Sequence, residues 1–108
     1  MPLASATYYA DSLPATDTVL YTVPPAQIGH MRIGLANRDR VNPRYFNIEI
    51  KRASTGKQVS ISGANSRLAP SGTAMCPMAG IGLQLSAGDE IHGWGDSDVE
   101  CLISGALE

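Results

Sequence analysis

Hydrophobic and polar residues alternate along most of this chain. The clearest case is the segment 44–52, in which Phe46, Ile48 and Ile50 are separated by polar residues. Successive side chains of a β-strand point to opposite faces, so this pattern predicts a strand with one buried face. We expect further strands in the segments 18–23, 28–37, 59–61, 67–69, 74–79, 81–85, 91–95 and 99–103.

Turn residues separate these segments and indicate where the strands end. Pro24-Pro25 ends the first segment, Ser54 to Lys57 forms a short hairpin turn, and Gly or Asp residues stand between the later segments. No window shows the 3.6-residue period of an amphipathic helix. About eight short strands at intervals of roughly 8–12 residues predict an all-β fold, an antiparallel β-sandwich. Strands of this number and length favour a two-sheet jelly roll.

Residues 1–16 differ from the remainder of the chain and are interpreted as an extended N-terminal arm. Two prolines disfavour a helix there, and the small polar residues around them show little alternation. The arm can bury little surface alone, so we expect it to be ordered only against a partner or a sheet edge. Tyr8 and Tyr9 are its only large anchoring groups and are predicted partner contacts. Residues 17–108 are predicted to form the β-sandwich domain.

The composition fits one soluble domain without a charged partner. The chain has 108 residues, a net charge of −2 and 17% charged residues, so no global field favours nucleic acid or an anionic membrane. The arginine-rich stretch from residue 32 to residue 52 is interleaved with Asp39 and Glu49, and phosphate binding is not expected there. The first residues lack the basic and apolar regions of a signal peptide, and no window is long enough to span a membrane. A soluble protein made in the cytosol is expected.

Groups that could carry catalysis or bind a metal are few. His30 and His92 fall in separate expected strands, whereas a jelly-roll metalloenzyme of the cupin type needs a close His-x-His pair. His92 alternates with the inward Ile91, so we expect it to face solvent or a subunit contact. The chain has no Gly-x-Ser-x-Gly motif and no histidine close in sequence to Cys76 or Cys101, so nucleophilic catalysis is not indicated. Both cysteines are interpreted as structural residues.

Two further features have both a structural and a functional interpretation. The spacing of Asp96, Asp98 and Glu100 could seat a calcium ion, but the glycine of the usual loop is missing, which favours a solvated turn. Trp94 stands between two glycines on the face opposite Ile91. It is either a core residue, a protein-contact anchor or a platform for a sugar. We name Trp94 with the two tyrosines of the arm as a candidate partner contact.

Three short motifs carry a resemblance to a known family. They are Thr16 with Leu20-Tyr21-Thr22-Val23-Pro24, then Asn37-Arg38-Asp39, then Leu85 with Gly88-Asp89 and Ile91. These motifs are similar to those of small accessory virion proteins of tailed bacteriophages, and the short stand-alone members of that group are capsid decoration, or cement, proteins. The resemblance spans most of residues 16–108. It implies a jelly-roll fold, homo-oligomeric assembly and no catalytic residues.

The function that this resemblance implies is structural. The protein would be made in the host cytoplasm, lie on the capsid surface of the virion, and stabilise the head by bridging capsomers. Its implied partners are the major capsid protein and further copies of itself, with a homotrimer favoured over a dimer because capsid three-fold junctions are common docking points. No enzymatic activity, cofactor, metal, nucleic acid or membrane is expected. Two alternatives stay open: a tail, baseplate or fibre-associated module, and a carbohydrate-binding β-sandwich.

Overall fold

The computed structural model describes residues 5–63, 65–76 and 83–108, and these residues form ten strands and no helix. The predicted all-β class is therefore confirmed. Parts of the predicted strands 74–79 and 81–85, and the first four residues of the predicted arm, lie outside the described residues. In chain order the strands are β1 (Ser5–Ser12), β2 (Thr18–Thr22), β3 (Gly29–Asn37), β4 (Arg44–Lys51), β5 (Gln58–Ser60), β6 (Ser66–Leu68), β7 (Thr73–Cys76), β8 (Leu83–Leu85), β9 (Glu90–Gly95) and β10 (Val99–Leu107).

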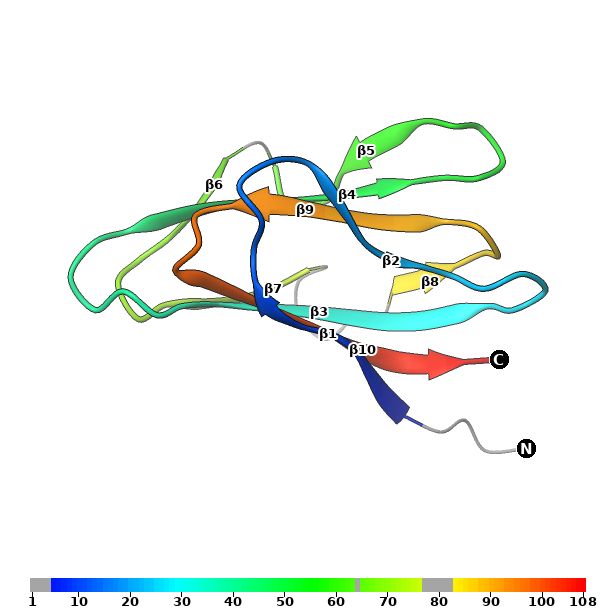
Figure 1. Ribbon diagram of the computed structural model, residues 1–108, viewed down its shortest axis with the longest axis horizontal. Coiled ribbons are helices and arrows are strands. Elements are labelled where there is room, and N and C mark those ends of the chain that lie inside the picture. Colours follow the sequence, from blue (N-terminus) through cyan, green and yellow to red (C-terminus); the bar gives the residue numbers. More distant parts are fainter. Residues whose placement is uncertain (1–4, 64, 77–82) are drawn as a thin grey trace.

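The strands form two antiparallel sheets that pack face to face (Figure 1). The first sheet has the order β1-β10-β3-β7, with β8 also paired to β3. The second sheet has the order β2-β9-β4-β5, with β6 also paired to β4. Most connections cross from one sheet to the other, so neighbours within a sheet are distant in sequence. The two layers are those of the predicted β-sandwich.

The ten strands occupy eight positions in the two sheets, because two positions are each filled by two short strands, and β1 is the strand that the sequence did not predict. β5 and β6 pair with successive parts of β4, residues 49–51 and 44–46. β7 and β8 pair in the same way with residues 33–36 and 29–31 of β3. When each interrupted pair is counted as one strand, the sheet orders become 1-8-3-6 and 2-7-4-5. This is the strand order of a jelly roll, as the number and length of the segments predicted.

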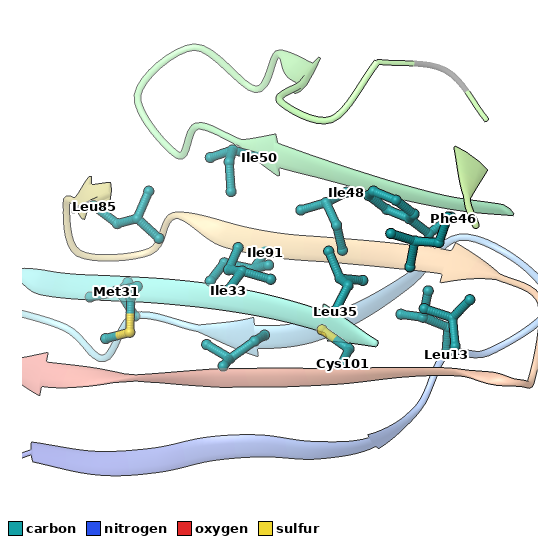
Figure 2. Packing of buried hydrophobic residues seen from close by; sticks show 14 residues of the cluster. Leu13, Met31, Ile33, Leu35, Phe46, Ile48, Ile50, Leu85, Ile91 and Cys101 are labelled. Atoms are coloured by element: carbon teal, nitrogen blue, oxygen red, sulfur yellow. The ribbon is translucent and has the colours of Figure 1, made fainter. Parts of the chain in front are cut away.

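Buried apolar side chains from both sheets fill the space between the layers (Figure 2). Full burial of one such side chain stabilises the fold by about 1.5–3 kcal/mol. The inward positions predicted by alternation in β3, β4 and β10 are all buried, including Cys101 at 1% exposure. The cluster consists of Leu13, Val23, Met31, Ile33, Leu35, Phe46, Ile48, Ile50, Leu68, Leu85, Ile91, Val99, Cys101 and Ile103.

β2 departs from the predicted alternation because it contains an irregularity. Regular alternation in the expected strand 18–23 would turn Val19 inward with Tyr21 and Val23, but Val19 is 44% exposed. The pairing of β2 with β9 shifts between Val19 and Tyr21, so one extra residue is accommodated there. That residue, Leu20, packs against the core instead. Gly93 leaves room for it, since a Cβ added to Gly93 would lie 2.6 Å from Leu20 Cδ1.

β1 lies within the segment that was predicted as a separate arm. It pairs with β10 from Ser5 to Ser12, with one register shift at Tyr8. The next residue, Leu13, is 3% exposed in the core, and its amide donates a 2.9 Å hydrogen bond to the Val99 carbonyl. The segment is extended and lies at a sheet edge, one of the two settings expected for it, and Leu13 joins the core of the sandwich.

The Gly88-Asp89 motif forms the turn between β8 and β9. Gly88 has a φ of 83°, a left-handed conformation that glycine adopts without strain. The Asp89 side chain accepts a 2.9 Å hydrogen bond from the Ser86 amide, which closes the turn. The backbone of the turn also exchanges two hydrogen bonds with Val23, of 2.9 and 3.0 Å. The motif thereby holds the end of β2 against the start of β9.

Candidate functional site

The β3–β4 loop, residues 38–43, is held in one conformation by the carboxylate of Asp39. Asp39 Oδ1 accepts backbone hydrogen bonds from Val41 at 2.8 Å and from Asn42 at 3.0 Å. Its Oδ2 lies 2.6 Å from Arg44 Nη2 and 3.1 Å from Arg44 Nε. Such two-pronged contact between a guanidinium and a carboxylate fixes both groups in orientation. The Asp39 side chain therefore spans the loop from its start to the first residue of β4.

Asn37, the last residue of β3, anchors the same loop from inside the protein. Its side chain is 3% exposed. Nδ2 donates to the backbone carbonyls of Asn42, Leu68 and Ala69 at 3.1, 3.3 and 3.1 Å, and Oδ1 accepts from the Asp39 amide at 2.9 Å. The Asn37-Arg38-Asp39 motif singled out in the sequence is thus the internal frame of this loop.

The electrostatics of the loop keep its ion pair formed at neutral pH. Hydrogen bonds from the Asn42 and Val41 amides, together with the Arg44 guanidinium, hold the pKa of Asp39 well below its usual range. The Asp39 hydrogen bond also raises the pKa of Arg44, with Asp98 contributing. Arg44 Nη2 lies 3.0 Å from Asp98 Oδ2. The loop is therefore joined electrostatically to the β9–β10 turn beside it.

This ordered frame displays apolar side chains at one end of the sandwich. Val41 is 79% exposed, the largest exposure of any large hydrophobic residue among those described. Tyr45, on β4 beside the loop, is 44% exposed, and its amide is fixed by a 2.8 Å hydrogen bond to Asp96 Oδ2. A preordered loop binds a partner with little further loss of conformational entropy. The loop end can therefore act as a protein-contact surface.

Each of the three acidic residues considered as calcium ligands forms a hydrogen bond or an ion pair with another residue of the protein. Asp96 accepts the Tyr45 amide, Asp98 pairs with Arg44, and Glu100 lies 3.5 Å from the Arg38 guanidinium. In the described parts of the chain, no three His, Cys, Asp or Glu side chains gather as metal ligands would. The structure thus places these carboxylates in the network that supports the loop end.

The two tyrosines predicted as partner contacts lie partly inside the protein. Tyr8 packs against the core, and its ring centroid is 4.7 Å from that of Tyr21 on β2. Tyr9 also packs against the core and donates a 2.8 Å hydrogen bond from its hydroxyl to the Ser12 carbonyl. Burial raises the pKa of both Tyr9 and Tyr21. Both tyrosines of β1 therefore have structural contacts within the sandwich.

Trp94, the third predicted contact, is half-buried on β9, where it is paired with Asn47 on β4. The alternation of β9 places it on the outer face of the second sheet, as predicted. The Asn47 side chain is itself committed, because it exchanges two hydrogen bonds with Asn65, of 2.7 and 3.1 Å. Trp94 and the β1 tyrosines belong to different sheets, so the structure does not unite the three residues in one site.

His92 lies on the same outer face as Trp94 but is not open to solvent. It is only 8% exposed, so of the two expectations for His92 the exposure to solvent is wrong, and the subunit contact stays a prediction. Its Nδ1 lies 2.7 Å from Asp17 Oδ1 and its Nε2 lies 2.8 Å from Glu90 Oε1. Burial alone would lower the pKa of His92, but the hydrogen bonds to these two carboxylates outweigh burial and raise it. Asp17 comes from a loop 75 residues away, which no local pattern could indicate.

The outer face of the first sheet carries an apolar patch that the sequence analysis did not predict. The patch consists of Ala10, Gly34, Ala36, Met75 and Leu102, which come from β1, β3, β7 and β10. Leu102 is 47% exposed and Met75 is 45% exposed. The sequence did contain a signal for this patch, because these apolar residues stand at outward positions of their strands, where polar residues are usual. Only the strand order shows that they gather in one place.

Comparison with known proteins adds no assignment. No protein-family model matches the chain, and no curated protein matches it. In the residues that the structure describes, no helix is present that could cross a membrane.

Proposed function

We propose that this protein is a non-enzymatic virion structural protein that decorates a bacteriophage capsid and stabilises the head by bridging capsomers. The observation that carries the proposal is the display of Val41 on the loop framed by Asn37 and Asp39. The jelly-roll fold and the motif resemblance to phage accessory proteins support it. The major capsid protein is the proposed partner of the loop end.

The proposed mechanism is the burial of the loop end against the assembled capsid lattice. Burial of an exposed apolar side chain contributes favourable hydrophobic free energy to binding. Because the loop is already ordered, little conformational entropy is lost when it binds. A protein that binds only the assembled lattice stabilises that lattice by mass action. Each bound copy would add contact area across a junction between capsomers.

Co-sedimentation with undecorated capsids tests this proposal. The variant Val41→Asp places a charge at the centre of the proposed contact and should weaken binding about tenfold or more, since about 1.4 kcal/mol of lost binding free energy corresponds to tenfold. The melting temperature should remain close to that of the wild-type protein, because Val41 is 79% exposed.

Val59→Asp is the matched control. Val59 is also exposed, at 56%, but lies on β5 at the opposite end of β4 from the loop (Figure 1). Capsid binding by the Val59 variant should match that of the wild-type protein. Equal binding by both variants would remove the loop end from the contact. A wild-type protein that binds tails or baseplates and not heads, seen by electron microscopy, would favour the alternative of a tail-associated module.

A further inference from the structure

The centre of the apolar patch is a row of residues that runs across four neighbouring strands. The strand register aligns Ala10 with Leu102, Leu102 with Gly34, and Gly34 with Met75. Alternating positions along each strand share a face, so these aligned side chains all lie on the outer face of the first sheet. Ala36 extends the row along β3.

The patch is hollow in the middle. A Cβ added to Gly34 would meet no atom within 4 Å, whereas Leu102 and Met75 stand on either side of it. The resulting trough has a volume of about 440 Å³ and is lined mainly by apolar groups. Apolar side chains gathered around a hollow offer a surface that another protein can cover.

We propose that a second copy of this chain covers the apolar patch, in a two-fold symmetric contact between the outer faces of the two first sheets. In such a contact the same surface serves both partners, so it must be complementary to itself. Leu102 of one copy would pack beside Leu102 of the other, and the charged residues at the two ends of the patch would pair between copies.

The charges on this face have the arrangement that a two-fold contact needs. Arg32 lies beyond one end of the patch on β3, beside Ser104, and Glu100 borders the other end on β10, beside Ala36. Glu100 lies 3.5 Å from Arg38 of its own chain, in an exposed pair of the kind that contributes little stability, so it can also pair with Arg32 of a second copy. Arg32 and Glu100 are therefore diagonal across the pair formed by Gly34 and Leu102. Consider a two-fold axis that lies in the plane of this face and runs perpendicular to the diagonal. It would place Arg32 of each copy opposite Glu100 of the other copy. Such charge complementarity sets the register of a contact.

The size of the face also suits a dimer. The four strands that carry the patch, β1, β3, β7 and β10, have eight, nine, four and nine residues. At about 3.3 Å per residue and 4.8 Å per strand they cover roughly 480 Å². Two such faces together give roughly 960 Å², close to the ~1,000 Å² in total that a specific interface needs. An apolar centre with a polar rim is the usual composition of such interfaces.

The proposed dimer does not depend on a capsid, so the purified protein alone tests it. Sedimentation equilibrium between about 1 and 100 µM covers a range in which a standard-size interface associates. The wild-type protein should reach twice the mass of one chain, and not the three times that the trimer expected from the sequence would give. Leu102→Asp should raise the dimer dissociation constant about tenfold or more. Arg32→Glu should do the same, because it places two acidic groups together across the contact.

Reversing both charges of the proposed Arg32–Glu100 pair distinguishes this contact from other contacts between copies. Arg32→Glu combined with Glu100→Arg in one chain restores opposite charges between copies and should recover the dimer. Lys57→Glu, a charge reversal in the exposed β4–β5 turn, is the control and should associate like the wild-type protein. A wild-type monomer throughout the range would overturn the inference, and so would an oligomer that Leu102→Asp and Arg32→Glu leave unchanged. A dimer that fails to bind capsids would instead contradict only the proposed function.

Discussion

The carboxylate of Asp89 accepts a 2.9 Å hydrogen bond from the backbone amide of Ala53, which joins the β8–β9 turn to the β4–β5 turn. The two residues are 36 positions apart in sequence. Asp89 is 1% exposed, and its second oxygen accepts the Ser86 amide at 2.9 Å and lies 3.2 Å from Arg52 Nε. Every contact of this buried carboxylate is with a donor, so one side chain holds two turns together.

Replacement of Asp89 should therefore cost more stability than its place in a turn suggests. In Asp89→Ala the amides of Ala53 and Ser86 lose their acceptor, and we expect the free energy of unfolding to fall by about 3 kcal/mol. Urea denaturation measures this change. Asp11→Ala is the control, because Asp11 accepts the Ser12 amide at an exposed site. A loss no larger than that of the control would show that the Asp89 contacts contribute little.

The position of His92 between two carboxylates predicts a dependence of stability on pH. The pKa of His92 is raised in the folded protein, so protonation stabilises the fold. This contribution is fully present below the unfolded pKa of about 6.5 and is lost as pH rises through the higher folded pKa. The pKa of Asp17 is lowered by hydrogen bonds from Gln58 and His92, so its contribution is lost only as pH falls through that lowered pKa.

Thermal melting from about pH 5 to pH 9 tests the His92 prediction across the range in which histidine titrates. The difference in melting temperature between the wild-type protein and His92→Gln should be largest at the acidic end and should shrink with rising pH. A difference that stays constant over the whole range would contradict the prediction.

Two glycines on the paired strands β3 and β10 should differ sharply in their tolerance of alanine. A Cβ added to Gly105 would lie 2.0 Å from the His30 carbonyl oxygen, which is backbone and cannot move aside. We expect Gly105→Ala to lower the free energy of unfolding by about 3 kcal/mol. Gly34→Ala, which meets no atom within 4 Å, should change it by less than about 0.5 kcal/mol. Similar values for the two variants, measured in urea, would contradict this difference.

The burial of Leu13 predicts that the N-terminal segment supports the fold. Leu13→Ala should lower the free energy of unfolding by about 2–4 kcal/mol, through lost burial and the cavity left in the core. Val19→Ala is the control, since Val19 is 44% exposed, and it should cost less than about 0.5 kcal/mol. Equal effects in chemical denaturation would show that residues before β2 do not support the core.

Local alternation was enough to predict the strands that carry the core, and it failed where the backbone is irregular. The inward residues of β3 and β4 follow a strict period of two, and the structure buries them as predicted. The register shifts near Tyr8 and Leu20 break that period, so the sequence pattern indicated an arm in place of β1 and an inward Val19. An extra residue in a strand moves each later side chain of that strand to the opposite face.

The contacts that define the candidate surfaces are long-range, so no local pattern contains them. His92 alternates with Ile91 as an outward residue does, yet Asp17 covers it from a distant loop. Leu102 and Gly34 are ordinary residues in their own strands and form a patch only because β10 and β3 are neighbours. The Asn37-Arg38-Asp39 motif was found in the sequence, but its role as a loop frame required the hydrogen bonds of the structure.

The interruption of two strands in the jelly roll has a consequence for behaviour at high concentration. A long, flat edge strand exposes unpaired backbone amides and carbonyls. Another chain can pair with these groups, which promotes polymerisation. Here the described edge strands include β5 and β6, of three residues each, and β1 and β2, whose pairings each contain a register shift, so none of these four offers a long, regular template. These edges disfavour fibrous growth by strand addition, so association between copies depends on side-chain contacts.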